Sequence, residues 1–106
     1  MKTRKAIIFF ATAVFAIAAQ AQVRGSPSCG SWTQERTGTR PVIENATWLL
    51  GLLSGVSFMS KTDFLRGTDN DSIYLWVDNY CKAQPLKFVF DAGMVLSVEL
   101  TQQKKL

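Results

Sequence analysis

The first 21 residues limit what the rest of this chain can fold into, because they have the pattern of a secretory signal peptide. A basic start without acids leads into a continuous apolar stretch from Ala6 to Ala19, and Ala19-Gln20-Ala21 fits the small-x-small cleavage rule. A retained membrane anchor is the alternative, but a spanning helix needs roughly 20 apolar residues, and this stretch is shorter. We expect a signal peptide over residues 1–21 and a single mature domain over residues 22–106.

Removing this leader changes the charge of the chain. Lys2, Arg4 and Lys5 leave with it, so the remaining bases exceed the 8 acids by only one. A nucleic-acid groove needs clustered Lys and Arg, whereas here the bases are scattered singly. We therefore expect no nucleic-acid partner, and no membrane association after the signal peptide is cleaved.

Cys29 and Cys81 are the only cysteines, and export would deliver them to an oxidising compartment. Their separation resembles neither a C-x-x-C redox motif nor a zinc site. A domain this small is near the lower limit of what a hydrophobic core alone can hold together. We predict one disulfide between Cys29 and Cys81, worth about 4 kcal/mol in the chain-entropy model. The compartment that fits is a bacterial periplasm.

The apolar residues recur at three- and four-residue spacing, which predicts an all-α domain, a small bundle of four short helices. Residues 22–28 are expected to form a flexible lead-in. Ser31 is expected to cap the first helix, with Gln34 completing a capping box, and this helix should end before Gly38. The second is expected to begin at Pro41 and to bury a stripe made of Val42, Ala46, Leu49, Leu53 and Val56.

The third and fourth helices are expected on either side of Pro85, with a break near Gln84. Asp69 or Asp71 would cap the third, whose apolar face is Ile73, Trp76, Val77, Tyr80 and Cys81. The expected core face of the fourth is Leu86, Val89, Phe90, Gly93, Met94, Leu96 and Leu100.

Gly51 and Gly55 lie four residues apart on the expected second helix. Glycine in a helix interior costs roughly 0.5–1 kcal/mol relative to alanine, so a pair of them calls for a reason. Polar neighbours argue against a membrane-type glycine motif. We expect that another helix backbone passes close to both glycines.

The chain offers little material for catalysis. It has no histidine, which removes the commonest general base and metal ligand. The Asp69–Asp71 loop begins like a calcium loop, but it lacks the following Gly and Glu, so helix capping explains it better. Asp69, Asp71 and Asp78 could work as acid and base only by position. We expect no enzyme, no metal and no cofactor.

A binding protein is the class that remains. Aromatic residues are plentiful after the leader, and aromatic side chains dominate the energetics of protein interfaces. Most of them should lie in the core. Tyr74 and Phe64 fall off the apolar stripes, so we predict that these two face a partner.

Three segments resemble a known family. They are Cys29-Gly30-x-Trp32, Trp48-Leu49-Leu50-Gly51-x-x-Ser54-Gly55, and Asp71-Ser72-x-x-x-Trp76-Val77-Asp78-Asn79-Tyr80-Cys81-Lys82-Ala83-x-Pro85-Leu86. The pattern, over about residues 29–100, resembles the Rap/Tai immunity proteins of type VI secretion. That resemblance implies a small disulfide-linked helical fold like that of the HdeA periplasmic chaperones. It also implies scaffold roles for both cysteines, Gly51, Gly55 and Pro85.

The functional expectation is a periplasmic protein that binds another protein, by resemblance an immunity protein that neutralises a toxin. The alternatives are an HdeA-like chaperone that holds client proteins in acid, and a toxin or accessory protein of a plasmid conjugation locus. A homodimer is also possible. An acid-switched chaperone should be rich in carboxylates, and 8 acids nearly balanced by bases make a weak switch, which favours the binder.

Overall fold

The computed structural model describes residues 22–38 and 43–104, and this part of the chain forms four helices. They are α1 (Cys29–Thr37), α2 (Glu44–Ser60), α3 (Asn70–Ala83) and α4 (Val89–Gln103). The only extended pairing among the described residues is a single bridge between Ser28 and Phe88. The predicted all-α fold with four short helices is confirmed. The proposed signal peptide lies outside the described residues.

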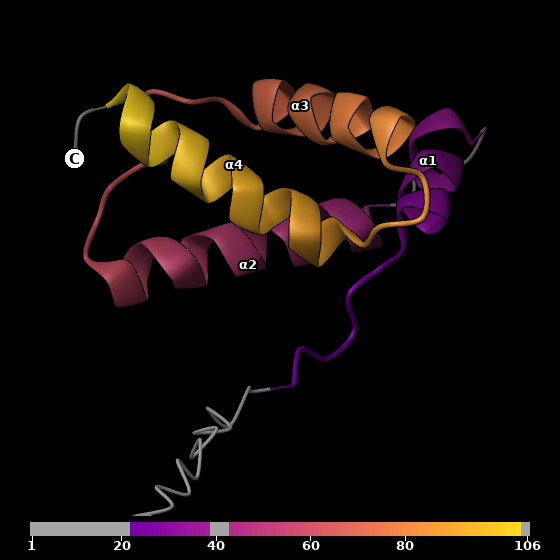
Figure 1. Ribbon diagram of the computed structural model, residues 1–106, viewed down its shortest axis with the longest axis horizontal. Helices are drawn as coiled ribbons and strands as arrows, with labels where there is room; N and C mark the ends of the chain where they lie inside the picture. The colour runs from indigo at the N-terminus through magenta and orange to yellow at the C-terminus, as the bar shows by residue number, and fades with distance from the viewer. Residues whose placement is uncertain (1–21, 39–42, 105–106) are drawn as a thin grey trace, which may run out of the picture.

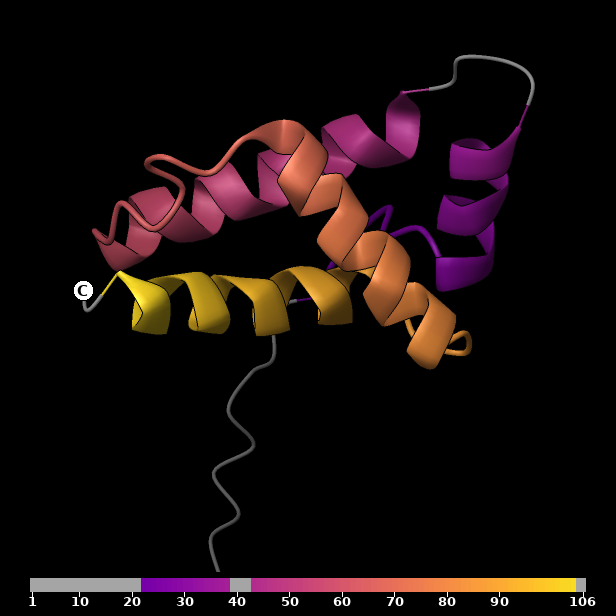
Figure 2. The same cartoon turned by 90° about the horizontal axis from the view of Figure 1, so that it is seen from above.

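The helices form two crossing pairs. Figure 1 shows α2 and α4 side by side, running in the same direction, with α1 at the end where both begin. Seen from above, α3 passes across this pair and reaches α1 (Figure 2). The core fills the space between them with Leu49, Leu53, Val77, Val89 and Leu96, all nearly or fully buried.

The disulfide between Cys29 and Cys81 is present, with 5.0 Å between the two Cα atoms and a sequence separation of 52. Both cysteines are buried, next to the fully buried Trp32. A helix as short as α1 is marginal in water by itself, so it depends on these contacts. The predicted disulfide is confirmed, and it links the first turn of α1 to the last turn of α3.

The first helix begins earlier than predicted. Ser28, not Ser31, is its N-cap, because the Ser28 hydroxyl accepts a hydrogen bond from the Ser31 backbone N–H at 3.0 Å. Cys29 is consequently the first residue of α1 rather than a residue before it. The backbone decides between the two serines: Ser28 pairs with Phe88, so the chain is extended there and turns into the helix directly afterwards.

The start of α2 is capped by a side chain of α1. Pro41 and Val42, placed in this helix from the sequence, lie outside the described residues, and α2 begins at Glu44. Its N-cap residue Ile43 has no side chain that could accept a hydrogen bond. Glu35 of α1 takes over this role, because its carboxylate accepts from the N–H groups of Asn45 at 2.8 Å and Ala46 at 3.2 Å.

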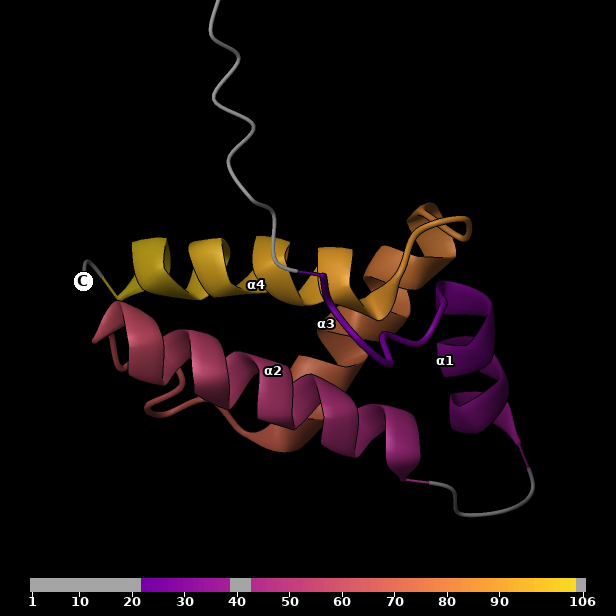
Figure 3. The ribbon, with the colours of Figure 1, turned by 90° about the horizontal axis from the view of Figure 1, so that it is seen from below.

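The lead-in before α1 is held in place, contrary to the flexible segment expected at 22–28. The backbone N–H of Val89 donates to Pro27 O, and the Phe90 N–H donates to the Ser26 hydroxyl. Farther back, the indole of Trp48 donates to Arg24 O at 3.2 Å. Figure 3 shows this segment passing between α1 and the start of α4. The lead-in therefore joins α1, α2 and α4.

The expectations for α3 and α4 are largely confirmed. Asp69 caps α3 by accepting from the Ser72 N–H at 2.7 Å, and α3 ends at Ala83, directly before Gln84. The predicted core positions of two residues of the fourth helix, Leu86 and Met94, are wrong. Leu86 precedes α4 and is 93% exposed, and Met94 is partly exposed, at 36%.

The expected close packing at Gly51 and Gly55 is wrong. Both glycines are exposed, and a Cβ added to either would meet nothing within 4 Å. The close approach occurs at Gly93 of α4, where an added Cβ would lie 2.7 Å from Leu52 Cδ2 and 3.4 Å from Leu49 Cδ1. Gly93 is therefore the glycine that lets α2 and α4 pack side by side.

Substitutions of these glycines should distinguish the open surface at Gly51 and Gly55 from the close contact at Gly93. Gly51→Ala and Gly55→Ala should each stabilise the protein by roughly 0.5–1 kcal/mol, because alanine favours the helix and no atom stands in its way. Gly93→Leu should destabilise it by about 1–3 kcal/mol through overpacking. Urea unfolding of the three variants measures both signs, and a destabilised Gly51→Ala protein would contradict an open surface at this glycine.

Candidate functional site

The two aromatic residues predicted to face a partner have different environments. Phe64 lies in the loop between α2 and α3, is 1% exposed and belongs to the core, so that prediction is wrong. Its backbone carbonyl also accepts a hydrogen bond from the Lys104 ammonium. Tyr74 is half-buried on α3 and packs against the core, with its ring 6.0 Å from that of Trp32. The structure does not bring the two together in one patch.

Tyr74 belongs to a cluster that joins α1 to α3. Asp78 accepts from the Trp32 indole N–H at 2.7 Å and from Nε and Nη2 of Arg36, both at 3.0 Å. The Arg36 guanidinium also lies over Tyr74, 5.4 Å from the ring centroid. The hydrogen bond to Asp78, opposed by some desolvation, raises the pKa of Arg36. This cluster joins the same two helices as the disulfide and satisfies its own polar groups, which suits a structural role.

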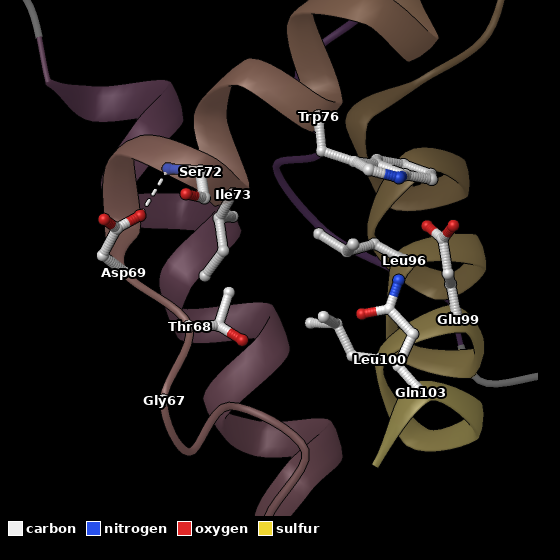
Figure 4. Close-up of a pocket in the computed structure, with 10 residues that line it drawn as sticks. All are labelled: Gly67, Thr68, Asp69, Ser72, Ile73, Trp76, Leu96, Glu99, Leu100 and Gln103. Atoms are coloured by element: carbon white, nitrogen blue, oxygen red, sulfur yellow. Dashed lines mark hydrogen bonds between the residues drawn. The ribbon is translucent and has the colours of Figure 1, made fainter.

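A hollow opens on another part of α3, beside Trp76. It has a volume of about 400 Å³ and lies between α3, α4 and the loop that precedes α3. Its apolar floor consists of Ile73, Trp76, Leu96 and Leu100, and its rim consists of Gly67, Thr68, Asp69, Ser72, Glu99 and Gln103. Figure 4 shows the leucines of α4 pointing toward Ile73, with the indole of Trp76 above them. We call this hollow the Trp76 pocket.

A second, shallower hollow adjoins it along α4. Trp76, Val95, Val98, Glu99 and Gln102 line this groove, so the two hollows share Trp76 and Glu99. Val95 is 49% and Val98 is 56% exposed, which is high for valine side chains. The two lie one helical turn apart, so they are neighbours on the surface of α4. We call the pocket and the groove together the Trp76 face.

The Trp76 indole is held in a fixed environment. Its ring stacks on that of Tyr80, one turn later on α3, with 5.7 Å between centroids and 17° between planes. Burial, helped by the charge of Asp91, raises the pKa of the Tyr80 phenol, which therefore stays neutral. A large aromatic side chain fixed by a neighbour loses little conformational entropy on binding, as an interface anchor should.

The charges of the Trp76 face have one sign. Asp69 and Glu99 line it, and no basic residue is among the lining residues of either hollow. Hydrogen bonding by Ser72, through its side chain and then its backbone N–H, lowers the pKa of Asp69 and keeps that carboxylate ionised. Across the described residues, no group of three His, Cys, Asp or Glu side chains is placed to hold a metal ion.

The sequence predicts Trp76 on the apolar face of α3, whereas the exposed positions of Val95 and Val98 were not predicted. A signal for them existed. The buried positions of α4 include Val89, Gly93, Leu96 and Leu100, and the two valines lie outside that stripe. Apolar residues that a helix does not need for its core are candidates for an interface.

The comparisons with known proteins add no relative. Comparison of the chain with protein-family models, with curated proteins and with solved structures gives no match in any of the three. None of the helices in the described part of the chain is both long and apolar enough to cross a membrane. The resemblance to the Rap/Tai immunity proteins stays a prediction that rests on the residues quoted for it.

Proposed function

We propose that this chain is an exported protein that binds another protein through the Trp76 face. The observation that carries the proposal is the exposed apolar strip of Val95 and Val98 beside the half-buried Trp76. Such a patch exposes hydrophobic surface that the fold does not need, and a fixed tryptophan with polar residues around it is typical of an interface centre.

Following the family resemblance, we propose an immunity protein of the bacterial periplasm that neutralises an incoming toxin. A small helical domain closed by a buried disulfide suits that task, because it must persist in an oxidising compartment. Binding without catalysis also agrees with a sequence that contains no histidine. An inhibitor needs only a surface that fits its target.

The direct test is protection from a toxin encoded beside this gene. Cells that secrete that toxin into the periplasm should survive when the full chain is co-expressed, and die with the Val95→Asp/Val98→Asp variant. Two buried charges at an interface centre should weaken binding at least about 100-fold. Thr47→Asp/Ser54→Asp is the matched control, because it adds the same charge to the exposed surface of α2.

Two outcomes would contradict this proposal. The first is the absence of any toxin against which the chain protects, and the second is full protection by the Val95→Asp/Val98→Asp variant. Thermal unfolding of both double variants controls for damage to the fold. Size-exclusion chromatography of the same proteins shows whether the face instead joins two copies of this chain.

One observation favours an acid-activated chaperone as a second candidate. Several carboxylates fix the ends or junctions of helices by accepting hydrogen bonds, and acid acts on a folded protein mainly through its carboxylates. They are Glu35 at the start of α2, Asp69 at the start of α3, Asp78 between α1 and α3, and Asp91, which accepts from the Phe88 N–H at the start of α4.

Acid should lower the stability of this protein without opening it. The folded-state pKa of Asp69 is lowered. Its carboxylate therefore contributes to the stability of the fold at neutral pH, and this contribution is lost as the pH falls below about 4, through the folded-state pKa. The disulfide and the apolar core do not titrate. We therefore expect a melting temperature a few degrees lower at pH 3 than at pH 7, with a cooperative transition and little binding of a dye for apolar surface. Strong dye binding at pH 3, together with client protection, would favour the chaperone.

A further inference from the structure

Three acids in the described part of the chain, Glu44, Asp71 and Glu99, have no hydrogen bond or ion pair, and only Glu99 of these lines a hollow. Glu99 lies between the Trp76 pocket and the groove, where Trp76, Val95 and Leu96 are its neighbours in the lining. Glu35, Asp63, Asp69, Asp78 and Asp91 all accept hydrogen bonds or ion pairs. Among the described residues, no hydrogen bond or ion pair engages the Glu99 side chain. A carboxylate beside apolar surface gains most from a partner that brings its own positive charge.

The Trp76 indole lies next to this carboxylate. In Figure 4 the Glu99 carboxylate extends from α4 toward the ring, while Asp69 lies across the pocket at the start of α3. The face of an indole attracts cations, and tryptophan does so more strongly than the other aromatic residues. The pocket thus combines a cation-attracting ring, two carboxylates and an apolar floor.

Lys104 is the basic residue tied to the rim of this pocket. Its ammonium donates to Phe64 O and to the Thr68 hydroxyl, so it is directed toward the loop between α2 and α3. It is not among the residues that line the pocket. Among the described residues, the negative charge of Glu99 is therefore left without a basic neighbour in the lining and can attract a cation from outside.

We infer that the Trp76 pocket receives an arginine side chain that the partner protein presents among apolar residues. This inference rests on the proposed function and specifies the chemistry of the partner. A guanidinium is planar and weakly hydrated, so it can stack on Trp76 while it hydrogen-bonds to Glu99. The methylene groups of the same side chain would cover the apolar floor, and apolar neighbours in the partner would contact Val95 and Val98.

The test uses n-butylguanidinium as a probe and n-butylurea as its neutral counterpart. Each is titrated into the oxidised mature protein, and two-dimensional ¹H–¹⁵N NMR follows the backbone amides and the Trp76 indole N–H. We expect butylguanidinium to shift the Trp76 indole and pocket amides, with an affinity roughly fivefold higher than that of butylurea. Glu99→Gln should remove most of this preference, and raising the salt concentration should weaken it.

Glu44→Gln is the matched control, because it makes the same chemical change at an exposed glutamate in the first turn of α2. It should leave the preference unchanged. Equal binding of the two probes, an unaltered preference in Glu99→Gln, or equal binding of n-butylammonium would each overturn the arginine inference. Because these probes need no partner protein, the result is independent of the protection assay. Protection without a cation preference would refute this inference alone.

Discussion

Removing the Cys29–Cys81 disulfide should cost the folded state about 4 kcal/mol. The bond joins two residues 52 positions apart in the sequence. In the chain-entropy model, removing it destabilises the folded state because the unfolded chain gains conformational entropy. Small domains are stable by only about 5–15 kcal/mol, so this is a large fraction of the total. Cys29→Ala/Cys81→Ala is the variant to measure, by urea unfolding against the oxidised protein.

The position of the bond adds a kinetic expectation. Both cysteines are almost completely buried, so a reductant can reach the sulfur atoms only when the structure opens. Reduction of the native protein should therefore be slow and should accelerate in moderate urea. In the variant, hydrogen exchange should rise first in α1, which loses its covalent link to α3. An unchanged unfolding midpoint in the variant would show that the disulfide does not hold the fold together.

The features that the sequence predicted well depend on local patterns or on simple counting. With only two cysteines in the sequence, there is one possible intramolecular pair, and Cys29 and Cys81 form it. Ile73, Val77 and Cys81 repeat at helical spacing, and all three are buried on α3. The cap at Asp69 follows from a short-range hydrogen bond to Ser72. None of these predictions needs knowledge of which helices are neighbours.

The features that it predicted poorly depend on contacts between distant segments. Ser28 and Ser31 are equally good caps in sequence, and the pairing of Ser28 with Phe88 selects the first. Gly51 and Gly93 are both helical glycines, but only the second faces another helix. The candidate site was missed for the same reason, because Trp76 lines a pocket only where α4 places Leu96 beside it.

Phe64 and Phe58 show this limit most clearly, and they give the last prediction. They lie six positions apart in the sequence, yet Phe64 is 1% exposed and Phe58 is 82% exposed. Helical periodicity assigns no face to Phe64, because it lies in the loop after α2. Its burial comes from the loop folding back over the core, where Lys104 holds the Phe64 carbonyl.

Phe64→Ala should destabilise the protein by about 3–5 kcal/mol, because it leaves a cavity in the core. Phe58→Ala removes the same side chain from the surface and should change the stability by less than about 0.5 kcal/mol. Urea unfolding of both variants measures the difference, and Phe64→Leu, with a smaller loss, covers the case in which the alanine variant does not fold. If Phe64 were instead a contact for the partner, Phe64→Ala would unfold at the urea concentration of the unchanged protein and would weaken protection against the toxin. Because the Phe64 ring is buried, we expect instead that Phe64→Ala lowers the stability of the purified protein, with no partner present.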